Sequence, residues 1–486
     1  MAKPKQFTRP PKKQKARTAE PQTAGDWQER ADLEEEAGGK WRAGDPAKSG
    51  RAFVRALEIY DNALQKFPKN FDLAYNKARL ELEITQQPAL LAHIGLPLPA
   101  FLAQTLESHR YALRLNEENA DILFNTSQVL ISLAEQLSEA DDSAQAIPLL
   151  HEALELLSAC LSRQEMMLEQ QQAGFEDLDE GGVELDVDER PALTSGSEPS
   201  EQTATIETPV TPGDLLDTVH ASISALTTLM ALVEPHQIET LGSMAQLLTE
   251  EKAPAYLKVV PEGDFESARF TNALDRANFL ATFADAQFNA HLIEAETYAA
   301  RLDEAFMISG KEMAVNALTS EGEARTELVL SVLSRFEESP GAPAEFCWQQ
   351  LKAAQHLYTA ATKLESSAQA YLARGDIDLL RHRLAAAPKS PLSEAMRKSA
   401  PTLAQNAQTY YRGATKLATN DDYAAGEKAS RRLVVASLLR QLLHGVEPTN
   451  SLAGSVHEAL AECVEDGVLE GGAAEELAEA AVKIGN

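Results

Sequence analysis

One short stretch constrains the fold more than any other: residues 56–68, which read ALEIYDNALQKFP. Ala56, Tyr60 and Ala63 are four and then three positions apart, which places them on one face of an α-helix. Two alanines let a neighbouring helix approach closely, and the tyrosine fills the space between them. Pro68 ends the helix, because proline lacks an amide hydrogen and disfavours helical backbone before it. The stretch therefore predicts the second helix of a packed helical pair.

The same four-and-three spacing recurs along the chain, which predicts internal repetition. The further copies are Ala146 and Ala153 around a leucine, then Ala354, Tyr358 and Ala361, and finally Ala407, Tyr411 and Ala414. The last two copies are 53 positions apart and share the letters ATKL at the same place. No stretch rich in β-branched residues alternates with a period of two, so we expect an all-α chain built as a helical-repeat solenoid.

These residues resemble the second helix of a tetratricopeptide repeat. Tyr75 with Asn76, and Phe124 with Asn125, fall where the first helix of such a repeat carries an aromatic residue and an asparagine. The resemblance implies an α-α superhelix with a concave binding groove, which these four residues would line. Heat-shock co-chaperones of this superfamily use such asparagines, together with basic residues, to clamp a C-terminal carboxylate. The helix around Asn125 has no basic residue, which favours a structural role for the asparagines.

Composition divides the chain into five parts. We expect a basic disordered tail over residues 1–25, helical repeats over 26–164, an acidic disordered linker over 165–214, helical repeats over 215–450 and C-terminal helices over 451–486. Residues 164–214 contain 14 acidic residues and only Arg190 as a base, and they are rich in glycine, serine, threonine and proline. Such a composition cannot form a packed core.

The formal charge of −30 indicates which partners to expect. The first 17 residues carry seven lysines and arginines and no acid, so the remainder carries −37. A body this acidic repels nucleic-acid phosphates and attracts basic proteins. We therefore expect a basic client and no direct contact with nucleic acid. The candidate client contacts are Glu176, Asp177, Asp179, Glu180, Glu184, Asp186, Asp188 and Glu189.

Two basic regions stand out against this background. Lys12, Lys13, Lys15 and Arg17 form a candidate nuclear-import signal; a phosphate-contacting arm and a solubilising end are the alternatives. Residues 374–440 hold twelve lysines and arginines and six acids. These bases are compatible with docking of the acidic linker, with contact to RNA, or with ordinary helix surfaces.

The sequence carries no motif typical of an enzyme, a cofactor site or a metal site. The SGKE stretch at 309–312 lacks the glycine and hydroxyl residue of a phosphate loop, and neither HEAL stretch has the second histidine of a zinc protease. Cys160, Cys347 and Cys463 lie far apart, which suits a reducing compartment. No apolar run reaches membrane-spanning length. We therefore expect a non-enzymatic protein of the cytoplasm and nucleus, without cofactor or metal.

The leading hypothesis is a protein-binding escort that acts as an assembly chaperone for a basic client such as a ribosomal protein. The chain is similar in fold and charge, though not in a matched motif, to acidic fungal tetratricopeptide chaperones for a large-subunit ribosomal protein. Two alternatives stay open. One is a scaffold subunit of a stable complex for RNA processing or transport, and the other is a heat-shock co-chaperone.

Overall fold

The computed structural model describes residues 21–140, 142–180, 209–335, 343–387, 390–419, 423–445 and 456–485. Every regular element within these ranges is a helix, which confirms the predicted all-α class. The chain forms two compact units, Met1–Asn116 and Glu117–Asn486. The boundary between the units therefore lies before the acidic segment 165–214 and not within it.

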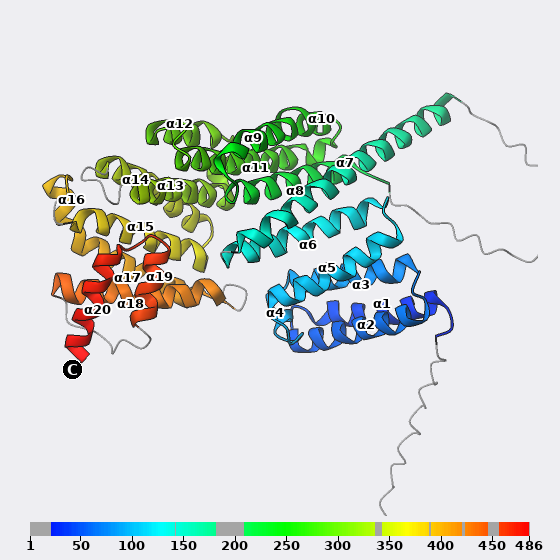
Figure 1. Cartoon of the computed structure of the whole chain (residues 1–486), viewed down its shortest axis with the longest axis horizontal. Coiled ribbons are helices and arrows are strands. Elements are labelled where there is room, and N and C mark those ends of the chain that lie inside the picture. Colours follow the sequence, from blue (N-terminus) through cyan, green and yellow to red (C-terminus); the bar gives the residue numbers. More distant parts are fainter. Residues whose placement is uncertain are drawn as a thin grey trace, which may run out of the picture. The chain divides into compact units, whose positions relative to one another are not determined.

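Unit 1 is built from helical pairs. Its helices are α1 (Ala24–Trp41), α2 (Pro46–Lys66), α3 (Phe71–Thr85), the single turn α4 (Pro88–Leu91) and α5 (Leu98–Leu115) (Figure 1). The side chains of Thr23, Asp45 and Asn70 accept hydrogen bonds from first-turn amides, which fixes where α1, α2 and α3 begin. α1 packs on α2 and α3 packs on α5 around a core that includes Phe53 and Phe101.

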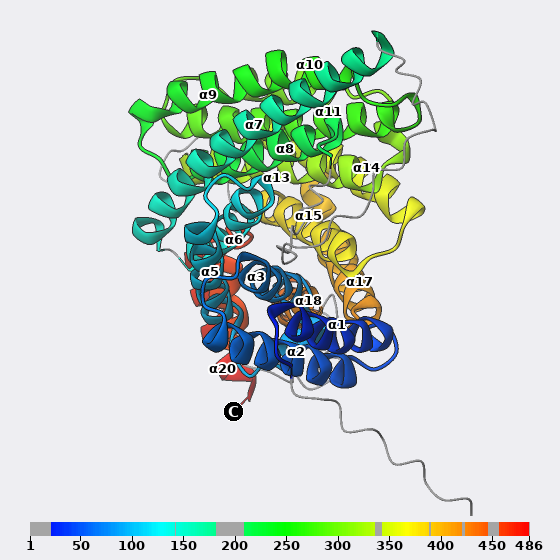
Figure 2. The ribbon, with the colours of Figure 1, turned by 90° about the vertical axis from the view of Figure 1, so that its right-hand side faces the viewer.

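Unit 2 is also built from helices that pack in pairs. They are α6 (Ala120–Glu139), α7 (Ser143–Glu180), α8 (Pro212–Met230), η1 (Pro235–Gln237), α9 (Ile238–Gln246), the π-helix η2 (Leu247–Lys252), α10 (Ala253–Leu257), α11 (Glu262–Asn289), α12 (Ala295–Ala305), η3 (Lys311–Met313), α13 (Val315–Arg335), α14 (Ala344–Leu364), α15 (Ala368–Ala386), α16 (Glu394–Lys398), α17 (Ala400–Leu417), α18 (Tyr423–His444), α19 (Val456–Glu465) and α20 (Gly471–Gly485). Helices close in sequence pack together, among them α6 on α7, α13 on α14 and α15 on α17. Figure 2 shows this succession within unit 2 from α7 to α17. The unit is thus a helical-repeat array.

The structure corrects the expected start of the acidic linker at residue 165. α7 continues past residue 165 to Glu180, and residues near its middle have tertiary partners. Gln164 accepts a hydrogen bond from Thr218 of α8 at 2.8 Å, and Glu165 lies 2.6 Å from Lys252. Of the predicted client contacts, Glu176, Asp177, Asp179 and Glu180 belong to the end of α7, whereas Glu184, Asp186, Asp188 and Glu189 lie outside the described residues. The candidate import residues Lys12, Lys13, Lys15 and Arg17 also lie outside them.

A glycine beneath a tyrosine ring recurs in two successive helical pairs of unit 2. Tyr358 of α14 lies against Gly322 of α13, and a Cβ on that glycine would be 2.8 Å from the ring. Tyr411 of α17 lies against Gly375 of α15, where a Cβ would be 2.4 Å from the ring. The two glycines are 53 positions apart, as are the two tyrosines. The internal repeat therefore extends to both helices of each pair.

The residues of the four-and-three pattern occupy the buried faces of their helices. Fully or almost fully buried are Ala56, Tyr60, Ala63, Ala146, Ala153, Ala354, Tyr358, Ala361, Ala407, Tyr411 and Ala414. Pro68 is exposed just beyond the end of α2, and its carbonyl accepts a hydrogen bond from the Tyr111 hydroxyl. Pro68 thus lies in a turn that α5 holds in place.

Candidate protein-binding groove

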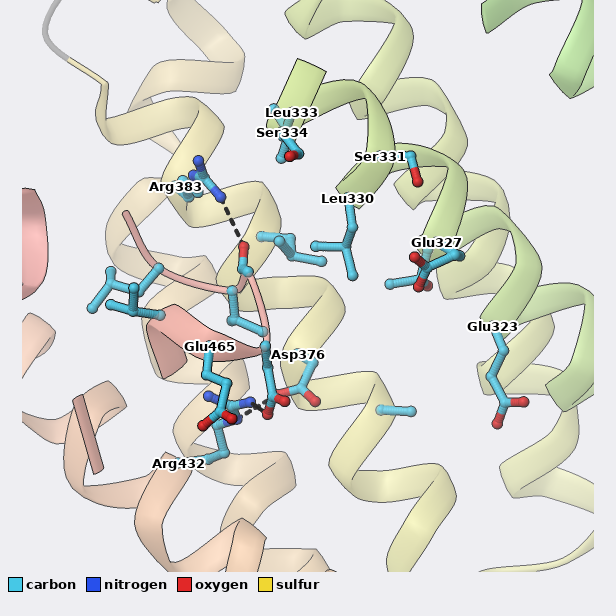
Figure 3. Close-up of a pocket in the computed structure, with 18 of the residues that line it drawn as sticks. Glu323, Glu327, Leu330, Ser331, Leu333, Ser334, Asp376, Arg383, Arg432 and Glu465 are labelled. Atoms are coloured by element: carbon cyan, nitrogen blue, oxygen red, sulfur yellow. Dashed lines mark hydrogen bonds and ion pairs between the residues drawn. The ribbon is translucent and has the colours of Figure 1, made fainter. Parts of the chain in front are cut away.

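A cavity of about 940 Å³ opens within unit 2 (Figure 3). Residues of α13, α15, α18 and the loop between α19 and α20 form most of its lining. A second cavity, of about 530 Å³, shares Glu323, Tyr358 and Ala373 with the first and extends to the first turns of α13 and α15. We call the two cavities together the α13–α15 groove.

The α13 wall of the groove presents two carboxylates without partners. Glu323 and Glu327 are one helical turn apart, and both are exposed to solvent. Neither makes a hydrogen bond or an ion pair with another described residue. Desolvation by the surrounding protein raises the pKa of both carboxyls, and the nearby Asp285 raises that of Glu327 further. Across the groove, α15 contributes the uncharged Ala373 and Leu380, while Arg383 of the same helix pairs with Glu470.

The other end of the large cavity contains a buried ionic cluster around Arg432 of α18. The Tyr411 hydroxyl donates to Asp376 at 2.6 Å, and Arg432 Nε lies 3.4 Å from the same carboxylate. Arg432 Nη2 also donates to Asp466, which lies 2.7 Å from Lys428 Nζ. Burial alone would lower the pKa of the Arg432 guanidinium, but these carboxylates raise it overall.

The same guanidinium is incompletely satisfied. Arg432 is fully buried, yet its Nε and Nη1 atoms make no hydrogen bond within the part of the chain that the structure describes. Figure 3 shows the side chain at the lower end of the cavity that it lines. A buried donor without an acceptor costs stability unless another group satisfies it.

Several bases of the locally basic segment 374–440 form ion pairs within the chain. These pairs are Arg374 with Asp378, Arg383 with Glu470, Lys398 with Glu394, Lys428 and Arg432 with Asp466, and Arg431 with Glu462. Four of these five carboxylates belong to α15, α19 and the loop after α19. Carboxylates within the chain therefore neutralise these bases.

The lining of the large cavity is acidic overall. It includes five carboxylates, those of Glu323, Glu327, Asp376, Glu465 and Asp466, and three bases, Arg383, Lys428 and Arg432. All three bases already have carboxylate partners. Glu465 is exposed and, like the two glutamates of α13, has no partner among the described residues. The groove therefore favours a cationic ligand.

The groove residues expected from the sequence lie elsewhere. Tyr75 and Asn76 are half-buried on α3 of unit 1, where Asn76 Nδ2 donates to Gln28 Oε1 at 3.2 Å. Phe124 and Asn125 are half-buried on α6 of unit 2, and Asn125 also has an interaction within the chain. None of the four lines either cavity.

Sequence reasoning missed the two glutamates of α13. Glu323 follows Gly322 as Asp376 follows Gly375, at the same interval of 53 positions. Aligning the repeats over both helices of each pair would have singled out this acidic position. No sequence signal distinguishes the acid that has a basic partner from the acid that has none.

The described ranges hold no group of three or more histidine, cysteine, aspartate or glutamate side chains placed to bind a metal ion. Their three cysteines, Cys160, Cys347 and Cys463, are buried free thiols. None of the helices in these ranges combines the length and the apolar character needed to cross a bilayer.

Comparisons with known proteins give a relative in sequence and likenesses among solved structures. No protein-family model matches the sequence. The chain is 37% identical over 131 residues to UPF0656 protein C926.02 of Schizosaccharomyces pombe, a match that spans 27% of this chain and 28% of that protein. Among solved structures, it is similar to a circular tandem repeat protein with novel repeat topology and enhanced subunit contact surfaces. That likeness has a TM-score of 0.29 and 13% identity, over 95% of this chain and 98% of the other.

Proposed function

We propose that the chain is a non-enzymatic escort that binds a lysine- or arginine-rich segment of a basic client in the α13–α15 groove. The observation that carries the proposal is the pair Glu323 and Glu327, which line the groove without partners. An ammonium or guanidinium group between them would remove their mutual repulsion. The raised pKa of both carboxyls fits this role, because desolvation disfavours the charged form until a cation arrives.

The wider character of the chain supports the same role. Its helical pairs with buried alanine–tyrosine faces resemble tetratricopeptide repeats, which bind segments of partner proteins. The charge of −30 suits a protein that covers cationic surfaces and keeps them from RNA. A ribosomal protein is the client class we propose, by analogy with the fungal escorts. With the basic N-terminal tail as an import signal, the escort would work in the cytoplasm and the nucleus.

The heat-shock co-chaperone alternative has less support. Its carboxylate clamp needs free asparagines beside basic residues, but Asn76 already donates to Gln28. The α13–α15 groove, with its unpaired glutamates, would repel a C-terminal carboxylate. The scaffold alternative predicts a complex held by apolar contacts, which high salt does not dissociate. The following experiment separates it from the escort role.

The test is affinity purification of the tagged chain from its own cells, washed first at about 0.05 M and then at about 1 M salt. One basic protein that is retained at low salt and lost at high salt is the expected result. The variant Glu323→Gln/Glu327→Gln should lose that protein already at low salt. A fixed set of several proteins that resists high salt would replace the escort by a scaffold.

A matched control separates groove chemistry from net charge. Glu296 and Glu304 lie exposed on α12, outside both cavities, and neither has a partner within the described ranges. The variant Glu296→Gln/Glu304→Gln changes the net charge by the same amount as the groove variant. It should retain the client as the unchanged chain does. Equal loss in both variants would show that overall charge, and not the groove, holds the client.

A further inference from the structure

We infer that α19, α20 and the loop between them, which we call the C-terminal hairpin, form a clamp that closes on a basic segment in the α13–α15 groove. This inference rests on the proposed function and adds a coupling between ligand binding and the position of the hairpin. The hairpin is not merely the end of the repeat array. The end of α19, the loop residues 466–469 and Gly471 of α20 form a wall of the large cavity.

The geometry of the wall gives the first reason. Glu465 of the hairpin and Glu327 of α13 both line the cavity, on elements that lie on opposite sides of it in Figure 3. Neither carboxylate has a partner among the described residues. Without a ligand, the like charges oppose closure of the hairpin toward α13. A lysine or arginine side chain between the two walls would attract both and favour closure.

The attachment of the hairpin gives the second reason. Charged contacts hold it on α15 and α18: Arg431 Nη2 lies 2.8 Å from Glu462, Lys428 Nζ lies 2.7 Å from Asp466, and Arg383 Nη1 donates to the Gly467 carbonyl at 2.7 Å. Its apolar contribution to the core comes mainly from short side chains and a few leucines, such as Leu460 and Leu469. An attachment with so many partly exposed ion pairs is weakened by salt and can be shifted by added charge.

The buried guanidinium of Arg432 is the third and independent reason to place a ligand here. Its Nη1 donor has no acceptor although the side chain is fully buried and lines the cavity. A backbone carbonyl of an extended segment could accept from it while a neighbouring basic side chain meets Glu465 or Glu327. Arg432 also donates to Asp466 of the hairpin, so the same side chain would connect the ligand to the clamp.

Cys463 provides a direct measure of the position of the hairpin. This residue of α19 is fully buried against the rest of unit 2. Burial raises the pKa of its thiol to about 11, although the nearby Arg432 opposes the shift. A thiol reagent therefore modifies Cys463 when the hairpin detaches. In the full chain with Cys160→Ser and Cys347→Ser, the modification rate reports detachment alone.

The experiment measures this rate with and without a fluorescent lysine–glycine peptide, while fluorescence anisotropy follows binding. We expect the peptide to bind and to slow modification of Cys463 at least about fivefold, a typical coupling between linked sites. A glutamate–glycine peptide should do neither. The variant Glu465→Gln should reduce the protection while the attachment through Arg431 and Glu462 stays intact.

Two further chains complete the test. Arg431→Glu should speed modification of Cys463 without peptide, and Arg431→Glu/Glu462→Arg should restore the slow rate. A chain that retains only Cys347, which lies on α14, should show no change with peptide. Binding of the peptide with an unchanged or faster Cys463 rate would overturn the clamp and leave the proposed function standing. Failure of the lysine–glycine peptide to bind would overturn both.

Discussion

Two acidic residues at the same repeat position, Glu323 in α13 and Asp376 in α15, have different environments. Each follows the glycine that lies beneath the tyrosine of the paired helix. Asp376 accepts a hydrogen bond from Tyr411 and lies 3.4 Å from the Nε atom of Arg432. Glu323 has no hydrogen bond or ion pair to any described residue. The two repeats therefore share the packing of glycine against tyrosine but differ in the partners of the acid.

The difference originates in the helix that packs next to each helical pair. This helix is α15 for the pair α13 and α14, and α18 for the pair α15 and α17. α18 brings Arg432 and Lys428 to the cluster around Asp376 and Asp466. α15 faces the groove below Glu323 with the uncharged Ala373. In this helical-repeat array, the neighbouring helix thus decides whether the acid at this repeat position has a basic partner.

The largest expected difference between the two positions is in stability. Asp376→Ala removes a partner of a buried guanidinium and should lower the free energy of unfolding by about 3 kcal/mol. Glu323→Ala removes an acid without a partner and should change it by no more than about 0.5 kcal/mol. Urea unfolding followed by circular dichroism measures both. Equal destabilisation would show that Glu323 has a structural role comparable to that of Asp376.

Alanine substitutions at Gly375 and Gly322 should give a smaller difference in the free energy of unfolding. Gly375→Ala places a Cβ 2.4 Å from the Tyr411 ring, which is fully buried and held by its hydrogen bond to Asp376. We expect overpacking to cost about 1 to 3 kcal/mol, in part offset by about 1 kcal/mol from the better helix propensity of alanine. At Gly322→Ala the Tyr358 ring borders both cavities and has room to shift, so the net cost should be smaller.

Thermal and urea unfolding of the two alanine variants, with Gly263→Ala as a control, would check this order. A Cβ on Gly263 in α11 meets no atom within 4 Å, so only the propensity gain should appear there. A stabilised Gly375→Ala variant would contradict the view that this close approach requires glycine.

The helical faces were predictable because helical periodicity is a local property. The spacing of Ala56, Tyr60 and Ala63 fixes which side of α2 is apolar, and that side is buried. The extent of α7 was not predictable from composition. Its continuation through Gln164 and Glu165 depends on Thr218 of α8 and on Lys252, more than fifty positions away in sequence.

The groove was even less accessible from the sequence. The acidic residues between 176 and 189 form a dense cluster in the sequence, whereas Glu323 and Glu327 are single acidic positions within a helix. Whether an acid binds a ligand or stabilises the fold depends on the tertiary partner that it finds. Glu323 and Asp376 show that an acid at the same repeat position can have a basic partner or none, depending on the neighbouring helix.

The smallest expected effect is a pH dependence of the free energy of unfolding that originates in the two groove acids. Desolvation raises the pKa of Glu323 and Glu327 above the ordinary glutamate value of 4.5. At neutral pH both residues are charged in the folded and unfolded chains, and their raised pKa values mean that they destabilise the folded state. Glu323→Gln/Glu327→Gln should therefore be more stable than the unchanged chain at neutral pH.

As the pH falls through the raised pKa values toward 4.5, the folded chain takes up protons at these sites before the unfolded chain does. The unchanged chain gains stability relative to the glutamine variant over this range, so the difference between the two should shrink. Urea midpoints across the range test this, and Asp376 contributes equally to both chains. Binding of a lysine-rich segment should weaken over the same range because protonation removes the charges that attract it. A stability difference that grows toward acid pH would mean that these carboxylates have a cationic partner in the folded chain, and would remove the contrast with Asp376.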